Sequence, residues 1–266
     1  MPEMAKTETA AYALTVADLL RKQAGTRAHA VALQDARGVL SYVELDRAAS
    51  RLAQALLVRG LRAGDRVAVL SENCREYLQL QLAAAKIGVV VACLNWRLAD
   101  AEITHCLRLV SPCMVFVSLR HAPTLARVEH GVPQVILIET QFDTFLSGVL
   151  EDDPLIDVDP EQGLVILYTS GTTGLPKGAV ISQRAMVARA MCFAGEYGIT
   201  AEHTYVAWSP LFHMAATDFS LATLMIGGKV VVQDGLDVDR LCATIAAEPI
   251  GWLVAMPGMI DVLIDG

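Results

Sequence analysis

The sequence contains no cysteine pair at C-x-x-C spacing and no group of histidines and cysteines at the spacing of a zinc site. A structural zinc ion therefore has no recognisable ligand set. The six cysteines stand far apart, mostly within apolar segments: Cys74, Cys93, Cys106, Cys113, Cys192 and Cys242. We expect unpaired, buried thiols, as in a protein of the reducing cytoplasm.

Positive charge is also scarce. The 266 residues include 21 Lys and Arg against 29 Asp and Glu, and no basic stripe alternates with aromatic residues. A nucleic acid is therefore not expected as a partner. The amino terminus carries Glu3, Lys6, Glu8 and Asp18 instead of the apolar core of a secretory signal. No uncharged run reaches the roughly 18 apolar residues of a membrane span, so we expect a cytoplasmic protein without a transmembrane segment.

Short apolar runs alternate with amphipathic helical patterns along the chain. Leu45, Leu52 and Leu56 recur at helical spacing within residues 42–59, and Gly60 supplies a stop. The run Val67–Leu70 is typical of a strand buried on both faces. Strands that alternate with helices of this length favour parallel pairing through right-handed crossovers. The sequence therefore predicts an α/β fold, a layered sandwich of mostly parallel sheets with flanking helices.

The same patterns predict the remaining elements. Helices are expected over residues 75–86, 100–109, 183–197 and 237–247, with Asp100 as a cap. Strands are expected within residues 87–94, 113–117, 164–168, 229–233 and 252–255. The acidic segment EDDPLIDVDPEQ, residues 151–162, is predicted to be an exposed connection with solvated carboxylates and no catalytic role.

The segment YTSGTTGLPKG, Tyr168–Gly178, follows the predicted strand 164–168 and precedes the predicted helix 183–197. Ligands of α/β sheets bind beyond the carboxyl ends of the strands. Glycines allow a backbone to approach a ligand, while hydroxyls and a lysine donate hydrogen bonds to it. The expected contact residues are Thr169, Ser170, Gly171, Thr172, Thr173, Gly174 and Lys177. Together these groups suit a polyphosphate.

Three familiar motifs do not describe this segment. A Walker A loop would need a glycine in place of Pro176 and a hydroxyl residue in place of Gly178. No G-x-G-x-x-G follows a strand, and no G-x-S-x-G makes Ser170 a nucleophile. A flexible surface turn is the plain alternative, although a turn needs neither the hydroxyls nor the lysine.

Tyr168–Gly178 closely resembles the phosphate-binding signature of the adenylate-forming (AMP-binding) superfamily. That superfamily includes acyl- and aryl-CoA synthetases, luciferases and peptide-synthetase adenylation domains. The resemblance covers nearly the whole chain. Residues 41–78 are similar to the amino-terminal segment of the family, residues 85–103 to the segment after it, and Ser209–Ala216 (SPLFHMAA) to a later motif.

The resemblance implies the two-step chemistry of an acid–thiol ligase. A small-molecule carboxylic acid attacks the α-phosphorus of ATP, pyrophosphate leaves, and the acyl group of the adenylate passes to CoA. Fixed donors and Mg²⁺ must offset the charge that develops. The contact residues named above would wrap the β- and γ-phosphates, with Lys177 steadying them. Thr172 would be the only candidate metal contact in this chain.

The resemblance also implies that His213 borders the carboxylate and the adenylate, which makes it the catalytic candidate. Adenylation domains for α-amino acids place an Asp directly after the Phe of this motif, whereas His213 follows Phe212 here. An imidazole cannot replace that fixed negative charge, so an acid without an α-ammonium group is favoured.

Further residues near this motif are candidates for the wall of the acyl pocket: Phe212, Met214, Thr217 and Asp218, with Phe219 and Leu221 beside them. Ala216 stands where many CoA ligases have glycine, and its methyl group would narrow the pocket. Asp218 is unexpected in such a wall, because an uncompensated carboxylate beside an acyl chain is costly.

The resemblance implies two related α/β subdomains, which we place at residues 1–185 and 186–266. The second is expected to be incomplete, and the adenine and ribose motifs and the carboxy-terminal catalytic domain have no counterpart in the sequence. We therefore expect the amino-terminal part of a synthetase, inactive alone, with exposed apolar edges that favour a homodimer. Two alternatives stay open, a noncatalytic module that binds nucleotide or a partner protein, and another adenylating enzyme such as a peptide-synthetase domain.

Overall fold

The computed structural model describes residues 13–169, 174–256 and 259–260. One group of strands comprises β3 (Arg66–Leu70), β4 (Val90–Cys93), β5 (Met114–Val117), β6 (Gln134–Leu137), β7 (Gly163–Thr169) and β8 (Lys177–Ser182). The other comprises β1 (Val31–Asp35), β2 (Gly38–Ser41), β9 (Thr204–Ala207), β10 (Lys229–Val232) and β11 (Ile250–Trp252).

The helices lie between and around these strands. They are α2 (Val16–Thr26), α3 (Tyr42–Val58), α4 (Arg75–Ile87), α5 (Asp100–Val110), α6 (Ala122–Arg127), α7 (Ile138–Phe145), α8 (Gln183–Tyr197), α9 (Met214–Ile226) and α10 (Val238–Ala247). Within the described ranges, none of them is both long enough and apolar enough to cross a membrane.

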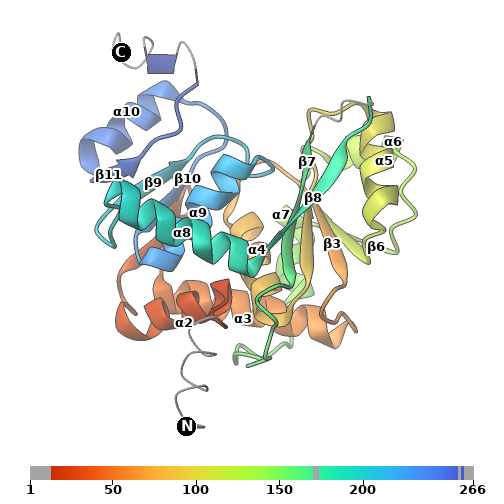
Figure 1. The fold of residues 1–266 in the computed structure, drawn as a ribbon. Helices are drawn as coiled ribbons and strands as arrows, with labels where there is room; N and C mark the ends of the chain where they lie inside the picture. The colour runs from red at the N-terminus through yellow and green to blue at the C-terminus, as the bar shows by residue number, and fades with distance from the viewer. Residues whose placement is uncertain (1–12, 170–173, 257–258, 261–266) are drawn as a thin grey trace.

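The strands form two sheets, one on each side of the molecule (Figure 1). The six-stranded sheet has the order β6-β5-β3-β4-β7-β8, and the five-stranded sheet has the order β11-β9-β10-β1-β2. Neighbouring strands run parallel except in the pairs β1–β2 and β7–β8. The predicted α/β fold with mostly parallel sheets is confirmed.

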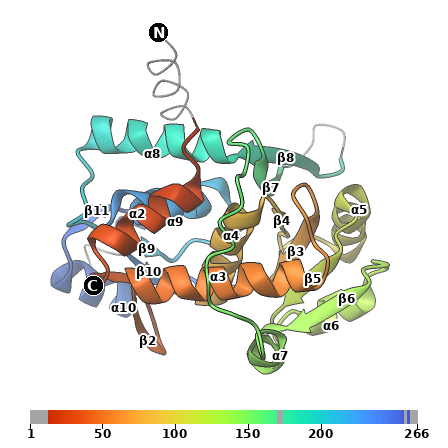
Figure 2. The same cartoon turned by 90° about the horizontal axis from the view of Figure 1, so that it is seen from below.

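A layer of helices between the sheets supplies core to both. The helix α4 is enclosed, because every residue from Glu76 to Ile87 is buried. Val69 of one sheet and Val230 of the other belong to the same apolar cluster as Leu80 of α4. The view from below shows α3 running along both sheets (Figure 2). Since protein cores are close-packed, this shared layer fixes the two sheets relative to each other.

The predicted helices are confirmed to within a residue or two at each end, and α3 shows the reason. Ser41 caps it by accepting a hydrogen bond from the Glu44 N–H, and the Glu44 carboxylate accepts one from the Ser41 N–H. Its leucines at helical spacing are buried, and Gly60 follows with φ +89°. The prediction that Asp100 caps α5 is wrong, because the N-cap is Ala99 and Asp100 is the first helical residue.

The strand β8 was not predicted, and it changes the setting of the predicted phosphate-binding segment. Residues 177–180 are exposed, so β8 lacks the apolar run that marks a buried strand. It pairs antiparallel with β7, from Gly163 opposite Ser182 to Thr169 opposite Lys177. The segment precedes the helix α8 as expected, but the unpredicted strand β8 lies between them. It connects the two strands of a hairpin, and α8 begins only after β8.

The prediction of unpaired, buried thiols is confirmed in part. All six cysteines are free, and Cys93 and Cys106 are buried. Cys192 is exposed on α8, and the other three are partly exposed. An apolar neighbourhood in sequence therefore did not determine how far each cysteine is buried.

The two sheets do not divide the chain at one residue. The six-stranded sheet is built from residues 66–182, but the five-stranded sheet combines β1 and β2 with β9, β10 and β11. Subdomains at residues 1–185 and 186–266 thus follow the order of the chain and remain a proposal.

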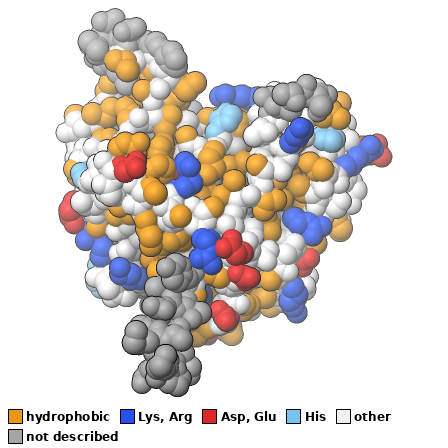
Figure 3. Space-filling model, viewed as in Figure 1, with side chains coloured by type: hydrophobic (Ala, Val, Ile, Leu, Met, Phe, Trp, Pro, Cys, Tyr) orange, Lys and Arg blue, Asp and Glu red, His pale blue; other side chains and the backbone are white. Residues whose placement is uncertain are grey.

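Hydrophobic side chains gather on the face that includes α8 and β8 (Figure 3). Val180, Met191 and Tyr197 are 61%, 57% and 65% exposed. Such a surface is compatible with association, but a homodimer through it stays a prediction.

The acidic segment 151–162 is held at one point by a cluster of ion pairs. The fully buried Lys86 Nζ lies 2.7 Å from Asp46 Oδ1 and also pairs with Asp153. The Arg21 Nε donates to Asp153 Oδ2 at 2.8 Å. Burial alone would raise the pKa of the Asp153 carboxyl, but hydrogen bonds from Arg21 and Lys86 outweigh it and hold this pKa well below its usual range. The prediction that these carboxylates are solvated is wrong for Asp153.

We predict that Asp153→Asn lowers the free energy of unfolding at pH 7 by about 3 kcal/mol, because it removes one partner of a buried ammonium. A carboxyl whose pKa is lowered by folding stabilises the protein above its unfolded pKa, so the difference should shrink below about pH 4. Urea unfolding of wild type and variant across pH measures this. Asp152→Asn, at the exposed neighbour outside the cluster, is the matched control. Equal stabilities at pH 7 would contradict the account.

Candidate functional site

The β7–β8 hairpin carries the predicted phosphate-binding residues at its tip. Thr169 ends β7, Lys177 begins β8, and the two are paired across the hairpin and exposed. Gly174 has φ +92°, a left-handed conformation that favours glycine, and open space surrounds the position of a Cβ atom. The remaining predicted contacts lie outside the described residues: Ser170, Gly171, Thr172 and Thr173.

The helix α5 contacts both strands of this hairpin close to its tip. The His105 Nε2 lies 3.1 Å from the carbonyl oxygen of Pro176, and the Tyr168 hydroxyl donates to the carbonyl oxygen of Cys106 at 3.2 Å. Pro176 is buried although its neighbours are exposed. The last residues of β7 and the residue before β8 are therefore attached to the same helix, at the carboxyl edge of the sheet.

A cavity of about 440 Å³ lies beside the hairpin. It is lined by Asn95, Leu98, Glu102, Tyr168, Thr169, Gly174, Pro176 and His213. The structure thus brings Thr169 and Gly174 together with His213, which comes from the segment between β9 and α9. Lys177 is not in its lining and lies in an adjoining surface hollow with His105 and Leu175.

His213 is the N-cap residue of α9, and its ring is exposed toward the cavity. The ring centroids of Phe212 and His213 are 4.4 Å apart, and Phe212 meets Trp96 edge to face at 5.6 Å. Partial desolvation, and to a smaller extent the charge of Arg97, lowers the pKa of the His213 imidazole below its ordinary value of 6.5. A neutral imidazole at pH 7 can both accept and donate a hydrogen bond.

The candidates for the acyl-pocket wall divide into two groups. Met214 is partly exposed at the start of α9, and Phe212 is buried. Thr217 and Asp218 are fully buried, and neither lines the cavity beside the hairpin. The Thr217 hydroxyl donates to the carbonyl oxygen of Leu211 at 2.6 Å. These two side chains are therefore committed to contacts inside the protein.

Asp218 has the compensating charge that the sequence did not reveal. The Arg189 Nε on α8 donates to Asp218 Oδ2 at 2.5 Å. Burial raises the pKa of the Asp218 carboxyl, and the interaction with Arg189 opposes this shift. The pair joins α8 to α9 and explains how a carboxylate is accommodated among apolar side chains.

Residues of the connection between β4 and α5, and of the first turn of α5, also reach the cavity, and sequence reasoning did not assign them to the site. Asn95 and Leu98 of the connection and Glu102 of α5 line it, and Arg97 lies over the rings of Trp96 and Phe212. Their position in the chain could have indicated this role. The connection follows β4, which is adjacent to β7, and the carboxyl ends of parallel strands meet at one edge of a sheet.

A magnesium site is not formed by the described residues alone, among which no group of three His, Cys, Asp or Glu side chains could hold a metal. Glu102 lines the cavity, but its Oε2 accepts from the Ala99 N–H at 2.9 Å. The candidate Thr172 lies outside the described residues.

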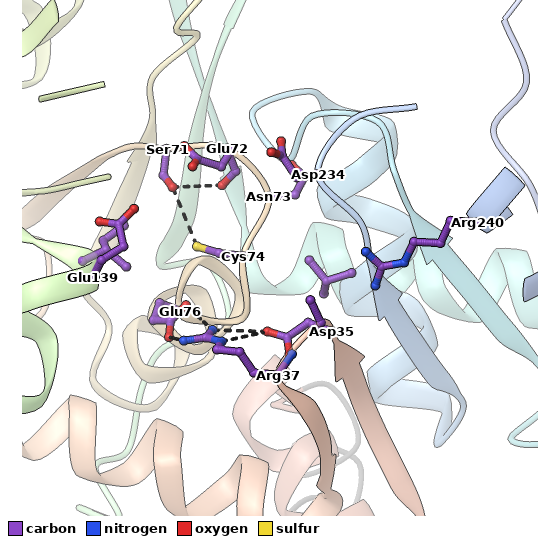
Figure 4. A pocket seen from close by; sticks show the side chains of 13 residues that line it. Asp35, Arg37, Ser71, Glu72, Asn73, Cys74, Glu76, Glu139, Asp234 and Arg240 are labelled. Atoms are coloured by element: carbon purple, nitrogen blue, oxygen red, sulfur yellow. Dashed lines mark hydrogen bonds and ion pairs between the residues drawn. The ribbon is translucent and has the colours of Figure 1, made fainter. Parts of the chain in front are cut away.

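A second cavity, of about 310 Å³, opens among the carboxyl ends of β1, β3 and β10. Asp35, Arg37 and Glu76 form ion pairs on one side of it, and Asp234 and Arg240 lie on the other (Figure 4). Burial alone would raise the pKa of Asp35, but the hydrogen bond from Arg75 and further contacts lower it to about 2. Because its carboxylates largely pair within the protein, we assign this cavity no ligand.

The chain is similar in sequence and in fold to known proteins. The chain is 29% identical over 232 residues to a feruloyl-CoA synthase of Amycolatopsis sp., covering 87% of this chain and 46% of that protein. It is 29% identical over 263 residues to an indoleacetate–CoA ligase of Aromatoleum aromaticum, covering 94% and 51%. The inhibitor-bound N-terminal domain of FACL13 from Mycobacterium tuberculosis has a TM-score of 0.88 at 25% identity and covers 95% of this chain and 65% of that chain.

Residues 20–266 match the family described as AMP-binding enzyme. The chain therefore belongs to the AMP-binding enzyme family, and the similarity to acyl- and aryl-CoA synthetases stated from the sequence is confirmed. It spans about half the length of the curated relatives it matches.

We predict that Arg97→Gln raises the pKa of the His213 imidazole, because it removes a nearby positive charge that disfavours the imidazolium. The value should stay below 6.5, since the desolvation remains. An NMR titration of the histidine rings measures the change. Arg108→Gln, which removes an exposed arginine paired with Glu129, should leave His213 unaffected. A His213 pKa that falls in Arg97→Gln would contradict the electrostatic assignment.

Proposed function

We propose that this chain forms the ATP-phosphate-binding half of an ATP-dependent carboxylate–CoA ligase. The observation that carries the proposal is the convergence of the hairpin residues Thr169 and Gly174 with His213 on one cavity, from two different sheets. Membership of the AMP-binding enzyme family supports it. The fold alone would not, because one fold serves many functions.

In the first step a carboxylate oxygen attacks the α-phosphorus of ATP, the bond to the pyrophosphate oxygen breaks, and an acyl-adenylate forms. The nucleophile and the triphosphate are both negative, so the site must supply positive potential and hydrogen-bond donors. Thr169, Gly174 and Lys177, with the intervening residues 170–173, would bind the β- and γ-phosphates. Mg²⁺ bound to ATP would neutralise further charge on the departing pyrophosphate.

His213 would orient the carboxylate. Its ring faces the cavity, its pKa is lowered, and the contact of Phe212 with Trp96 fixes the backbone that carries it. A neutral imidazole can donate a hydrogen bond to the acid without bringing a proton that would quench the nucleophile. In the second step the thiol of CoA takes the acyl group and AMP leaves.

The substrate is proposed to be an aryl or alkyl acid without an α-ammonium group. His213 occupies the position after Phe212, Asp218 is paired with Arg189, and Glu102 accepts from Ala99. These carboxylates are therefore committed to other partners and cannot bind an ammonium without losing them. The relatives whose names specify ferulate and indoleacetate fit this class.

We predict that Lys177→Ala weakens ATP binding to the 266-residue chain by about 10- to 100-fold, because a hydrogen bond between charged groups is lost. Calorimetric titration with Mg·ATP measures the affinity. Lys22→Ala, at an exposed lysine on α2, is the matched control. Equal affinities of wild type and Lys177→Ala would remove the phosphate assignment.

We predict that the full-length protein catalyses exchange between ATP and pyrophosphate that depends on a carboxylic acid, because formation of the adenylate is reversible. Lys177→Ala combined with Thr172→Ala should slow the exchange by about 100-fold or more, since two donors to the departing pyrophosphate are lost. Exchange that proceeds at the wild-type rate in the double variant would contradict the mechanism. Alanine at Lys22 again serves as the control.

A further inference from the structure

Asn73 makes four hydrogen bonds that connect the two sheets. It lies in the loop after β3 of the six-stranded sheet and is 8% exposed. Its Nδ2 lies 3.0 Å, 2.8 Å and 3.2 Å from the carbonyl oxygens of Ala207, Ser209 and Gln233. Its Oδ1 accepts from the Leu211 N–H at 2.8 Å. Ala207 ends β9 of the five-stranded sheet, Ser209 and Leu211 follow β9, and Gln233 directly follows β10.

The orientation of this amide is fixed by its partners. Carbonyl oxygens only accept and a backbone N–H only donates, so Nδ2 must face the three carbonyls and Oδ1 must face Leu211. An aspartate in place of Asn73 would present oxygen to carbonyl oxygens. An alanine would leave the buried Leu211 N–H without its acceptor, which is costly in a low-dielectric interior.

Leu211 is held at its other end as well. Its carbonyl oxygen accepts from the Thr217 hydroxyl, and the Thr217 Oγ1 accepts from the Gln81 Nε2 at 3.1 Å. Gln81 is a residue of the enclosed helix α4, which begins directly after the loop of Asn73. The N–H of Leu211 is thus bonded directly to Asn73 in the loop after β3. The C=O of Leu211 is linked through Thr217 to Gln81 of α4.

His213 lies two residues beyond Leu211, while the phosphate-binding hairpin extends the sheet that contains β3. We propose that Asn73 is a positioning residue, which sets the place of His213 relative to the hairpin by fixing Leu211 across the gap between the sheets. This inference rests on the proposed function for its catalytic meaning, but the placement of His213 can be tested without any activity.

The test compares Asn73→Ala with Gln183→Ala in the 266-residue chain. Gln183 is a matched control, because its amide is buried like that of Asn73 and bridges backbone groups, the Val16 N–H and the Ala85 carbonyl, each at 3.0 Å. It lies at the end of β8 away from the hairpin tip. The measurement is the NMR signal of the His213 ring, assigned with His213→Gln and read together with the unfolding stability of each variant.

We expect both variants to lose stability, but only Asn73→Ala to displace the His213 ring signal, while the signal of the distant His130 stays in place in both. An unchanged His213 signal in Asn73→Ala would overturn the proposal. So would an equal displacement in Gln183→Ala, because the effect would then reflect general loosening. Mg·ATP affinity should change by less than about twofold in Asn73→Ala, since the hydrogen-bond partners of the Asn73 side chain are Ala207, Ser209, Leu211 and Gln233 and none of them belongs to the hairpin.

A second variant keeps the proposal testable if Asn73→Ala does not fold. Thr217→Val preserves the side-chain shape but removes the hydroxyl that holds the Leu211 carbonyl, so it should displace the His213 signal in a folded protein. No displacement in Thr217→Val would count against the proposal even without Asn73→Ala.

Activity of the full-length protein distinguishes a positioning residue from a purely structural one, because loss of a purely structural residue would affect both substrates alike. Asn73→Ala should lower kcat/KM for the acid in the exchange reaction by about 100-fold, because a small misplacement of a catalytic group has an effect of this size. The KM for ATP should stay within about twofold of wild type. Equal losses for both substrates would contradict a positioning role. If wild type shows no exchange, the proposed function fails, and the ring signals still decide the role of Asn73.

Discussion

The helix α4 is enclosed between two sheets, and several polar groups on it and just before it find their partners in other parts of the protein. Lys86 pairs with Asp46 and Asp153, Gln81 binds Thr217, and the preceding Asn73 binds the ends of β9 and β10. Each of these contacts ties another element to the same helix. The burial that stabilises the molecule therefore also determines which loops can lie beside one another.

The site follows from this arrangement. Parallel strands of both sheets place their following loops at neighbouring edges, and the shared helical layer keeps those edges together. The hairpin of β7 and β8 comes from one sheet and His213 from the other, so neither sheet alone contains the candidate site. A protein that must bring a polyphosphate and a carboxylate together can use two rigid edges more readily than one flexible loop.

Local patterns in the sequence determined most of the helices and the buried strands. The capping pair of Ser41 and Glu44 and the one-sided leucines of α3 are signals that need no knowledge of the rest of the chain. Strand β8 was missed because its exposed face has no apolar run, and its pairing with β7 depends on a turn. The pairing of β1 with β10 could not be predicted either. The two strands lie about 200 positions apart in the chain, and only long-range packing brings them together.

The candidate site was predictable where chemistry is concentrated in one segment, as in Tyr168–Gly178. The residues that complete the cavity, Asn95 and Glu102, carry no such signature and are recruited by their place after β4. Thr217 and Asp218 show the opposite case. The resemblance makes them candidates for the acyl-pocket wall, which stays a prediction, and the structure adds their interior hydrogen bonds to Leu211 and Arg189. Partners of this kind become visible only when the chain is folded.

The most direct measurement of the central claim is a map of NMR shifts in the 266-residue chain during titration with Mg·ATP. The account predicts that the amides of Thr169, Gly174 and Lys177 and the ring of His213 shift together, at the same ATP concentration. The amides of Asp234 and Arg240, which line the second cavity, should not move. Shifts confined to the second cavity, or a hairpin that does not respond while ATP binds, would contradict it.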